Sequence, residues 1–120
     1  KIVERAKKEN IVRVLDDQFG SPTYTYDVAR ALLSIAKGDF YGLYHCANRG
    51  VVSRFEEARF IVETLGLNAE VIPVKSKDFP TLAKRPRYTP LENYLLELEG
   101  IFYMRDWRSA MEEFLKGEGL

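Results

Sequence analysis

Short hydrophobic runs alternate along the chain with stretches whose apolar residues recur at helical spacing. Three of the runs are rich in β-branched or aromatic residues and too short for helices: 11–15, 41–47 and 69–74. We predict a strand at each of them. The run at 41–47 is apolar along most of its length, which predicts a buried strand.

Five further stretches have the hydrophobic spacing of helices or the residues that start and stop them. They cover residues 1–8, 25–37, 54–65, 91–98 and 107–116. The third is marked most clearly, because Ser53 and Glu56 form a capping box before it and Gly66 is a stop signal after it. Asp106 is a candidate cap for the last helix.

The helix at 25–37 is predicted to start at Thr25 as its N-cap and to stop at Gly38. Its apolar positions predict one core-facing side. These positions are Val28, Leu32, Leu33 and Ile35.

Strands that alternate with helices predict an α/β fold with parallel pairing. About three short strands with four to five helices are few for an independent doubly wound sheet, so we expect the remaining strands to lie outside this chain. The helical pattern already runs through residues 1–8, with no cap before it. We therefore expect residues 1–120 to form a single domain or a fragment of one.

Composition excludes several classes of partner. With 120 residues, 46% of them hydrophobic, the chain can bury one core of ordinary size. Eighteen basic and eighteen acidic residues cancel, so we expect neither nonspecific nucleic-acid binding nor attraction to an anionic membrane. No apolar run approaches the ~20 residues that span a bilayer. Any anion site must therefore be local.

One cysteine, Cys46, and one histidine, His45, restrict the remaining chemistry. No internal disulfide can form, and we predict no metal site, which fits a reducing cytoplasmic setting. We interpret His45 as a structural side chain within the 41–47 strand and Cys46 as inert packing. We expect Trp107 in the core, and Tyr24 and Tyr26 to pack on one side of their segment.

Two polar segments are candidates for ligand binding. The first is Asp16–Thr23, a loop after a predicted strand that carries the only glutamine, Gln18, whose amide offers both donors and an acceptor. The second is Lys84–Arg87, where three cations surround Pro86, and arginine forms paired bonds with phosphate. The simpler interpretations are a turn stabilised by aspartates and a solvated charged loop, and the residues alone leave both open.

Several motifs of catalysis are missing from the sequence. None of the seven tyrosines has a lysine four positions later, and there is no glycine-rich dinucleotide loop, hydrolase elbow or P-loop. We therefore predict no catalytic residue and no cofactor-binding residue in this chain, and no activity of the chain alone.

Taken together, the motifs resemble the C-terminal part of the dTDP-4-dehydrorhamnose reductase family. The most specific are Asp-Gln-Phe-Gly-Ser-Pro-Thr at 17–23 and Pro-Thr-x-Ala-Lys-Arg-Pro at 80–86. The segments that carry the resemblance, in order, are Val14–Thr25, Gly42–Gly50, Ser53–Ala58, Phe79–Pro86, Trp107–Ala110 and Phe114–Leu115.

This resemblance implies an extended short-chain dehydrogenase whose Rossmann part, with the nicotinamide and the catalytic residues, is missing here. The intact enzyme would use NADPH or NADH to reduce the C4 keto group of dTDP-6-deoxy-L-lyxo-4-hexulose, giving dTDP-L-rhamnose. This chain would bind the dTDP-sugar. The resemblance places Gln18, Gly20, Pro22 and Thr23 beside the sugar, and it places Lys84 and Arg85 near the diphosphate or base.

Two alternatives remain open. Regulatory relatives such as the β subunit of methionine adenosyltransferase have the same fold and serve as binding partners, and other nucleotide-sugar epimerases or dehydratases share it too. The resemblance also implies that Tyr41–Cys46 joins a large sheet in the intact enzyme. An isolated piece would expose that edge, so we expect it to self-associate.

Overall fold

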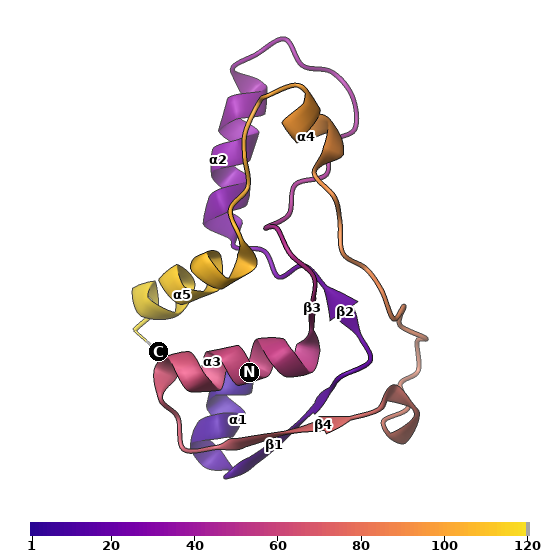
Figure 1. Ribbon diagram of the computed structural model, residues 1–120, viewed down its shortest axis with the longest axis vertical. Helices are drawn as coiled ribbons and strands as arrows, with labels where there is room; N and C mark the ends of the chain where they lie inside the picture. The colour runs from indigo at the N-terminus through magenta and orange to yellow at the C-terminus, as the bar shows by residue number, and fades with distance from the viewer. Residues whose placement is uncertain (120) are drawn as a thin grey trace.

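The computed structural model describes residues 1–119, with principal extents of 51 × 34 × 20 Å. Figure 1 shows α1, α3 and the paired strands β1 and β4 in one half, and α2 and α4 in the other. The elements in chain order are α1 (Ile2–Lys8), β1 (Ile11–Leu15), β2 (Phe19–Gly20), α2 (Thr25–Ala36), β3 (Val52–Ser53), α3 (Arg54–Leu65), β4 (Glu70–Val74), the 3-10 turn η1 (Ser76–Asp78), α4 (Tyr94–Leu98) and α5 (Trp107–Gly117).

The first half is built on the parallel pair β1 and β4, in register from Ile11 opposite Glu70 to Leu15 opposite Val74. Helices α1 and α3 supply Ala6 and Val62, which pack with Val12 into a small core. The predicted strands at 11–15 and 69–74 and their parallel pairing are therefore confirmed, as is the α/β class.

A second core lies between α2, α4 and the segment that leads to α5. Ala31, Leu96 and Met104 are fully buried in it, and Val28 and Ile35 of α2 pack against them. Within residues 1–119 the buried apolar residues thus form two separate clusters rather than the one core expected.

The predicted strand at 41–47 is wrong. This segment is irregular, and across the described residues the backbone of Tyr41–Cys46 makes no hydrogen bond to another backbone group. A strand needs a neighbour, but β1 and β4 pair with each other, and this segment lies against α4 instead. Tyr41 and Leu43 are consequently 87% and 82% exposed, and His45 is exposed rather than inside a strand.

The apolar side predicted for α2 is half right. Leu32 and Leu33 are 56% and 60% exposed, because the buried stripe follows Val28, Ala31 and Ile35. Thr25 is the first helical residue and not the N-cap, which is Tyr24 and has no side-chain capping bond.

The predicted ends of α3 and α5 are confirmed. Ser53 Oγ accepts a hydrogen bond from Glu56 N, and Gly66 closes α3 in the left-handed conformation at φ 62°. Asp106 caps α5 through a bond from Arg108 N, and Trp107 is buried at 2% exposure. Helix α4 is shorter than predicted and covers only Tyr94–Leu98. None of the helices within residues 1–119 has the length and apolar character needed to cross a membrane.

Candidate functional site

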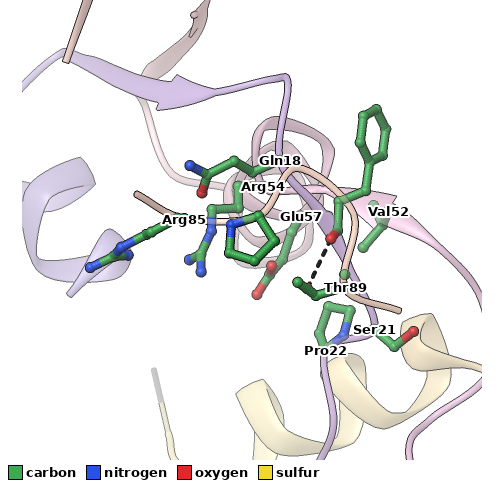
Figure 2. Close-up of a pocket in the computed structure, with 11 residues that line it drawn as sticks. Gln18, Ser21, Pro22, Val52, Arg54, Glu57, Arg85 and Thr89 are labelled. Atoms are coloured by element: carbon green, nitrogen blue, oxygen red, sulfur yellow. Dashed lines mark hydrogen bonds between the residues drawn. The ribbon is translucent and has the colours of Figure 1, made fainter. Parts of the chain in front are cut away.

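A pocket of about 340 Å³ opens where the loop after β1 meets the start of α3. We call it the central pocket (Figure 2). It is lined by Gln18, Phe19, Gly20, Ser21, Pro22, Val52, Arg54, Glu57, Arg85, Pro86 and Thr89.

Backbone pairing brings these distant segments together. Strands β2 and β3 form a two-residue antiparallel pair, which sets the loop beside the first turn of α3. On its other side, Phe19 N donates to Arg87 O at 2.7 Å, and Thr89 N donates to Phe19 O at 3.0 Å. The irregular segment with Arg85 is thereby held against the Gln18 loop, although 70 residues separate Phe19 from Thr89.

Gln18 is buried at 8% exposure and lies between two cavities. Its Nε2 donates to Ser76 Oγ at 3.4 Å, and Ser76 in turn donates through both its N and its Oγ to the Asp17 carboxylate. The Ser76 hydroxyl lowers the pKa of Asp17 below its ordinary value, and the Ser76 backbone N–H adds to this effect. The end of β1 is thus tied to the turn after β4.

The basic segment lines a second and larger cavity of about 820 Å³, which we call the basic recess. Lys84 lies only here, whereas Gln18 and Arg85 line both the recess and the central pocket. The other cations around the recess are Lys77 and Arg87. Lys84 and Arg85 are exposed, so the recess is open to solvent.

Thr23 stiffens the loop from outside the central pocket. Its hydroxyl donates to Ser21 O at 2.9 Å and accepts from Asn48 N at 3.2 Å, and Ser21 Oγ donates to Gly50 O. Thr23 lines a third cavity of about 350 Å³, which we call the apolar pocket. The structure therefore brings Gln18, Gly20, Pro22 and Arg85 together around one pocket, with Thr23 and Lys84 in the neighbouring cavities.

Asn48 anchors this loop to the rest of the molecule. Fully buried, it accepts from Tyr24 N at 2.8 Å and donates to the Asp27 carboxylate at 2.8 Å. Asp27 also pairs with Arg105 at 2.9 Å, and this bond raises the pKa of Arg105 above its ordinary value. The network fixes the start of α2, and with it the far end of the loop.

Arg54 and Glu57 are pocket residues that sequence reasoning missed. They stand three positions apart at the start of α3 and so share one face of the helix. Figure 2 shows their side chains directed into the same open space as Arg85. The capping box located this first turn, but only the β2–β3 pairing, which is not local, turns it toward the Gln18 loop.

The expected packing role agrees with the structure for Cys46, whereas Tyr26 is 56% exposed. Burial raises the pKa of the Cys46 thiol, and its Sγ lies 3.6 Å from Met104 Sδ, as expected for an inert side chain. Tyr24 and Tyr26 have ring centroids 5.9 Å apart. Within residues 1–119, no three histidine, cysteine or acidic side chains gather in a group suited to a metal ion.

The site presents donors of the kind that suit an anion with a polar neighbour. Arg54 and Arg85 offer planar guanidinium donors at one pocket, while the Gln18 amide is held by Ser76 at its edge. The fold and the site therefore define an α/β ligand-binding domain suited to an anionic ligand with polar substituents.

The chain belongs to the family described as the RmlD substrate binding domain, whose model matches residues 1–119. It is similar to the dTDP-4-dehydrorhamnose reductase of Mycobacterium tuberculosis (strain ATCC 25618 / H37Rv), with 46% identity over 102 residues, 83% of this chain and 34% of that protein.

Solved structures give the same relationship. The crystal structure of a dTDP-4-dehydrorhamnose reductase from Clostridium acetobutylicum matches 99% of this chain and 42% of its own, with a TM-score of 0.95 and 33% identity. The Bacillus anthracis enzyme of that name, solved in complex with NADP, matches 97% of this chain and 41% of its own, with a TM-score of 0.90 and 31% identity. The chain therefore spans about a third to two fifths of the length of these relatives.

Proposed function

We propose that this chain is the nucleotide-sugar-binding portion of a dTDP-4-dehydrorhamnose reductase. It holds the dTDP-sugar while the C4 keto group of dTDP-6-deoxy-L-lyxo-4-hexulose is reduced to give dTDP-L-rhamnose. The observation that carries the proposal is the meeting of Gln18 and Arg85, from segments far apart in sequence, at one pocket in a domain of this family.

The charges around the site indicate which part of the ligand each segment contacts. Arg85 and Arg54 neutralise the diphosphate, and Lys84 in the basic recess adds a longer-range attraction. Gln18, Gly20 and Pro22 then form the wall beside the sugar, and Thr23 holds this loop in place from the neighbouring apolar pocket. Alignment of a reacting carbon by such distant contacts is worth several kcal/mol, up to roughly 7–11 in favourable intramolecular cases.

The cofactor of the intact enzyme, NADPH or NADH, would be bound outside this chain. The described residues provide no glycine-rich loop at a helix N-terminus and no tyrosine–lysine pair for proton transfer, so they do not fit a nicotinamide site. The proposal thus requires a Rossmann partner domain and limits residues 1–120, as a single unit, to binding and orienting the substrate. We place the protein in the cytoplasm, where a free thiol such as that of Cys46 stays reduced.

Substrate turnover by the intact gene product tests the proposal, with consumption of NADPH or NADH as the readout. We expect Arg85→Ala to raise KM for the dTDP-sugar about 10- to 100-fold, because a charge-assisted bond contributes roughly 1.5–3 kcal/mol. Melting should change little, since Arg85 is exposed. Arg13→Ala, an exposed cation on β1, is the control for loss of charge. An equal loss of fold and binding in Arg85→Ala would make Arg85 structural.

A second variant tests the sugar side of the pocket. Gln18→Ala should reduce discrimination between sugars more than affinity for dTDP, and unaltered selectivity would remove Gln18 from the site. Calorimetry with dTDP, UDP and GDP separates this reductase from other nucleotide-sugar enzymes of the fold. Binding of the sugar without turnover, with either nicotinamide, would favour the regulatory module instead.

A further inference from the structure

The central pocket and the apolar pocket meet at two residues, Pro22 and Glu57, which line both. The apolar pocket, of about 350 Å³, extends from there toward α5 and is large enough for a small ring-shaped group. Its walls are mainly apolar. The residues around it are Pro22, Thr23, Tyr24, Thr25, Asn48, Glu57, Trp107, Ala110, Met111 and Phe114.

Glu57 is an acidic side chain without a protein partner at this junction. It is half-buried, and among the described residues no hydrogen bond or ion pair reaches its carboxylate. Burial raises its pKa, and the nearby Arg54 opposes that shift only in part. A carboxylate withdrawn from water is stabilised by hydrogen-bond donors, so this one is suited to receive them from a ligand.

The charges decide which part of a ligand can face Glu57. A diphosphate would be repelled by the carboxylate and attracted to Arg54 and Arg85 on the side of the central pocket. A nucleotide-sugar carries no cationic group, so in a ligand of this class the part beside Glu57 is a neutral one with an O–H or N–H donor. Thymine and a 6-deoxysugar both meet this requirement, and each also carries a methyl group that suits the apolar walls formed by Trp107 and Phe114.

We propose that Glu57 is a specificity-determining residue, which accepts a hydrogen bond from a neutral O–H or N–H of the bound nucleotide-sugar where the ligand passes from the central pocket into the apolar pocket. The ligand class rests on the proposed function. The junction of the two pockets and the unpaired carboxylate do not depend on it.

Calorimetry on the intact gene product tests the inference with dTDP and dTDP-L-rhamnose. Glu57→Leu removes the acceptor and should weaken binding about 10- to 100-fold. Glu57→Gln keeps an acceptor oxygen without the charge and should weaken it less. Glu56→Gln is the matched control, because Glu56 is the adjacent exposed acid and lines neither pocket.

The two ligands locate the donor. If Glu57→Leu weakens dTDP and dTDP-L-rhamnose equally, the donor lies on the thymidine part, and if it weakens only the latter, the donor lies on the sugar. Glu57→Leu should melt no lower than the wild type, because it removes an unpaired, half-buried charge. A loss of affinity in a variant that melts normally is therefore a binding effect.

Unchanged or tighter binding by Glu57→Leu would overturn the inference, since Glu57 would then only repel the diphosphate. Calorimetry with UDP- and GDP-sugars extends the comparison, and binding by the variants is measured with whichever ligand the wild type binds. If the wild type prefers another nucleotide and Glu57→Leu still weakens binding of that ligand, the proposed function is wrong. Glu57 nevertheless remains a specificity-determining residue. Absence of binding to every nucleotide-sugar defeats both.

Discussion

Asp17 and Ser76 join the carboxyl ends of the two parallel strands through three hydrogen bonds. These bonds are stronger to the ionised carboxylate than to the protonated one, and they therefore lower the pKa of Asp17 from its ordinary 3.8. A lowered pKa in the folded state means that the contribution to stability is complete above about pH 4. It is lost as the pH falls through the folded-state value.

We therefore expect Asp17→Asn to lower the urea midpoint of unfolding at pH 7 and to have almost no effect at the acid end, below the folded-state pKa. Urea titrations across this range measure the difference. In a Ser76→Ala background the same substitution should have a smaller effect, because the hydroxyl bond is gone and only the bonds from the backbone N–H of residue 76 remain. A constant gap between Asp17→Asn and the wild type at all pH values would show that the charge is not the cause.

Gly50 has a backbone that other residues rarely adopt, and it lies against the core tryptophan. Its φ is 106°, and a Cβ at this position would lie 2.7 Å from Trp107 Cδ1. We expect Gly50→Ala to lower the free energy of unfolding by roughly 2–5 kcal/mol, from backbone strain and steric overlap together.

Gly66→Ala is the control for Gly50→Ala. It also has a positive φ, 62°, but no atom within 4 Å of the added Cβ, so it should cost only about 1–2 kcal/mol. Thermal unfolding of both variants separates the contact from the strain. Equal losses would mean that Trp107 moves aside without cost.

Single residues could be predicted from sequence where their chemistry is local. Gln18 and Arg85 stood out by composition and motif, and both line the central pocket. Glu57 did not, because an acid in the first turn of a helix is ordinary. Only the folded chain shows that it lies between two cavities without a partner.

At the scale of elements, helix α3 links stability to the site, because its first turn holds Arg54 and Glu57. Ser53→Ala removes the bond from Glu56 N to Ser53 Oγ and should cost about 1 kcal/mol. It should also weaken ligand binding, since the pocket wall is less ordered. Ser109→Ala, an exposed serine within α5, should have neither effect. Chemical denaturation and calorimetry on the same samples check both parts.

Helix ends were predicted well and strand pairing less well, for a physical reason. A cap or a glycine stop depends on a few adjacent residues, as at Ser53, Gly66 and Asp106. A strand depends on a partner elsewhere. Residues 41–47 have the composition of a strand, but residues 1–119 offer them no neighbouring strand. The two-residue strands β2 and β3 leave almost no pattern to detect.

At the scale of the whole molecule, the unpaired 41–46 segment leaves two large apolar side chains uncovered. Tyr41 and Leu43 are almost fully exposed there. We expect the isolated chain to self-associate through this area, and Leu43→Lys to reduce the association. Sedimentation velocity over a range of concentrations is the measurement.

Leu82→Lys is the control for that experiment, because Leu82 is fully exposed in the distant basic segment. It should leave the association unchanged. A wild-type chain that sediments as a monomer at every concentration would contradict the prediction, and an equal effect of both substitutions would assign the association to overall charge.

The α/β class and the parallel pair were accessible from sequence, but the division into two cores was not. Hydrophobic spacing shows which side of a helix is buried, but not against which element. Leu32 and Leu33 have the same spacing as true core residues, yet α2 turns Ala31 inward instead.

The central pocket is built from segments that are far apart in the sequence, and this has a consequence for the mechanics of the domain. Its walls come from the Gln18 loop, the first turn of α3 and the segment with Arg85. A bound molecule would contact all three segments and would bind least well when they separate. By mass action, the ligand would then stabilise their arrangement, so that binding and ordering are one thermodynamic event.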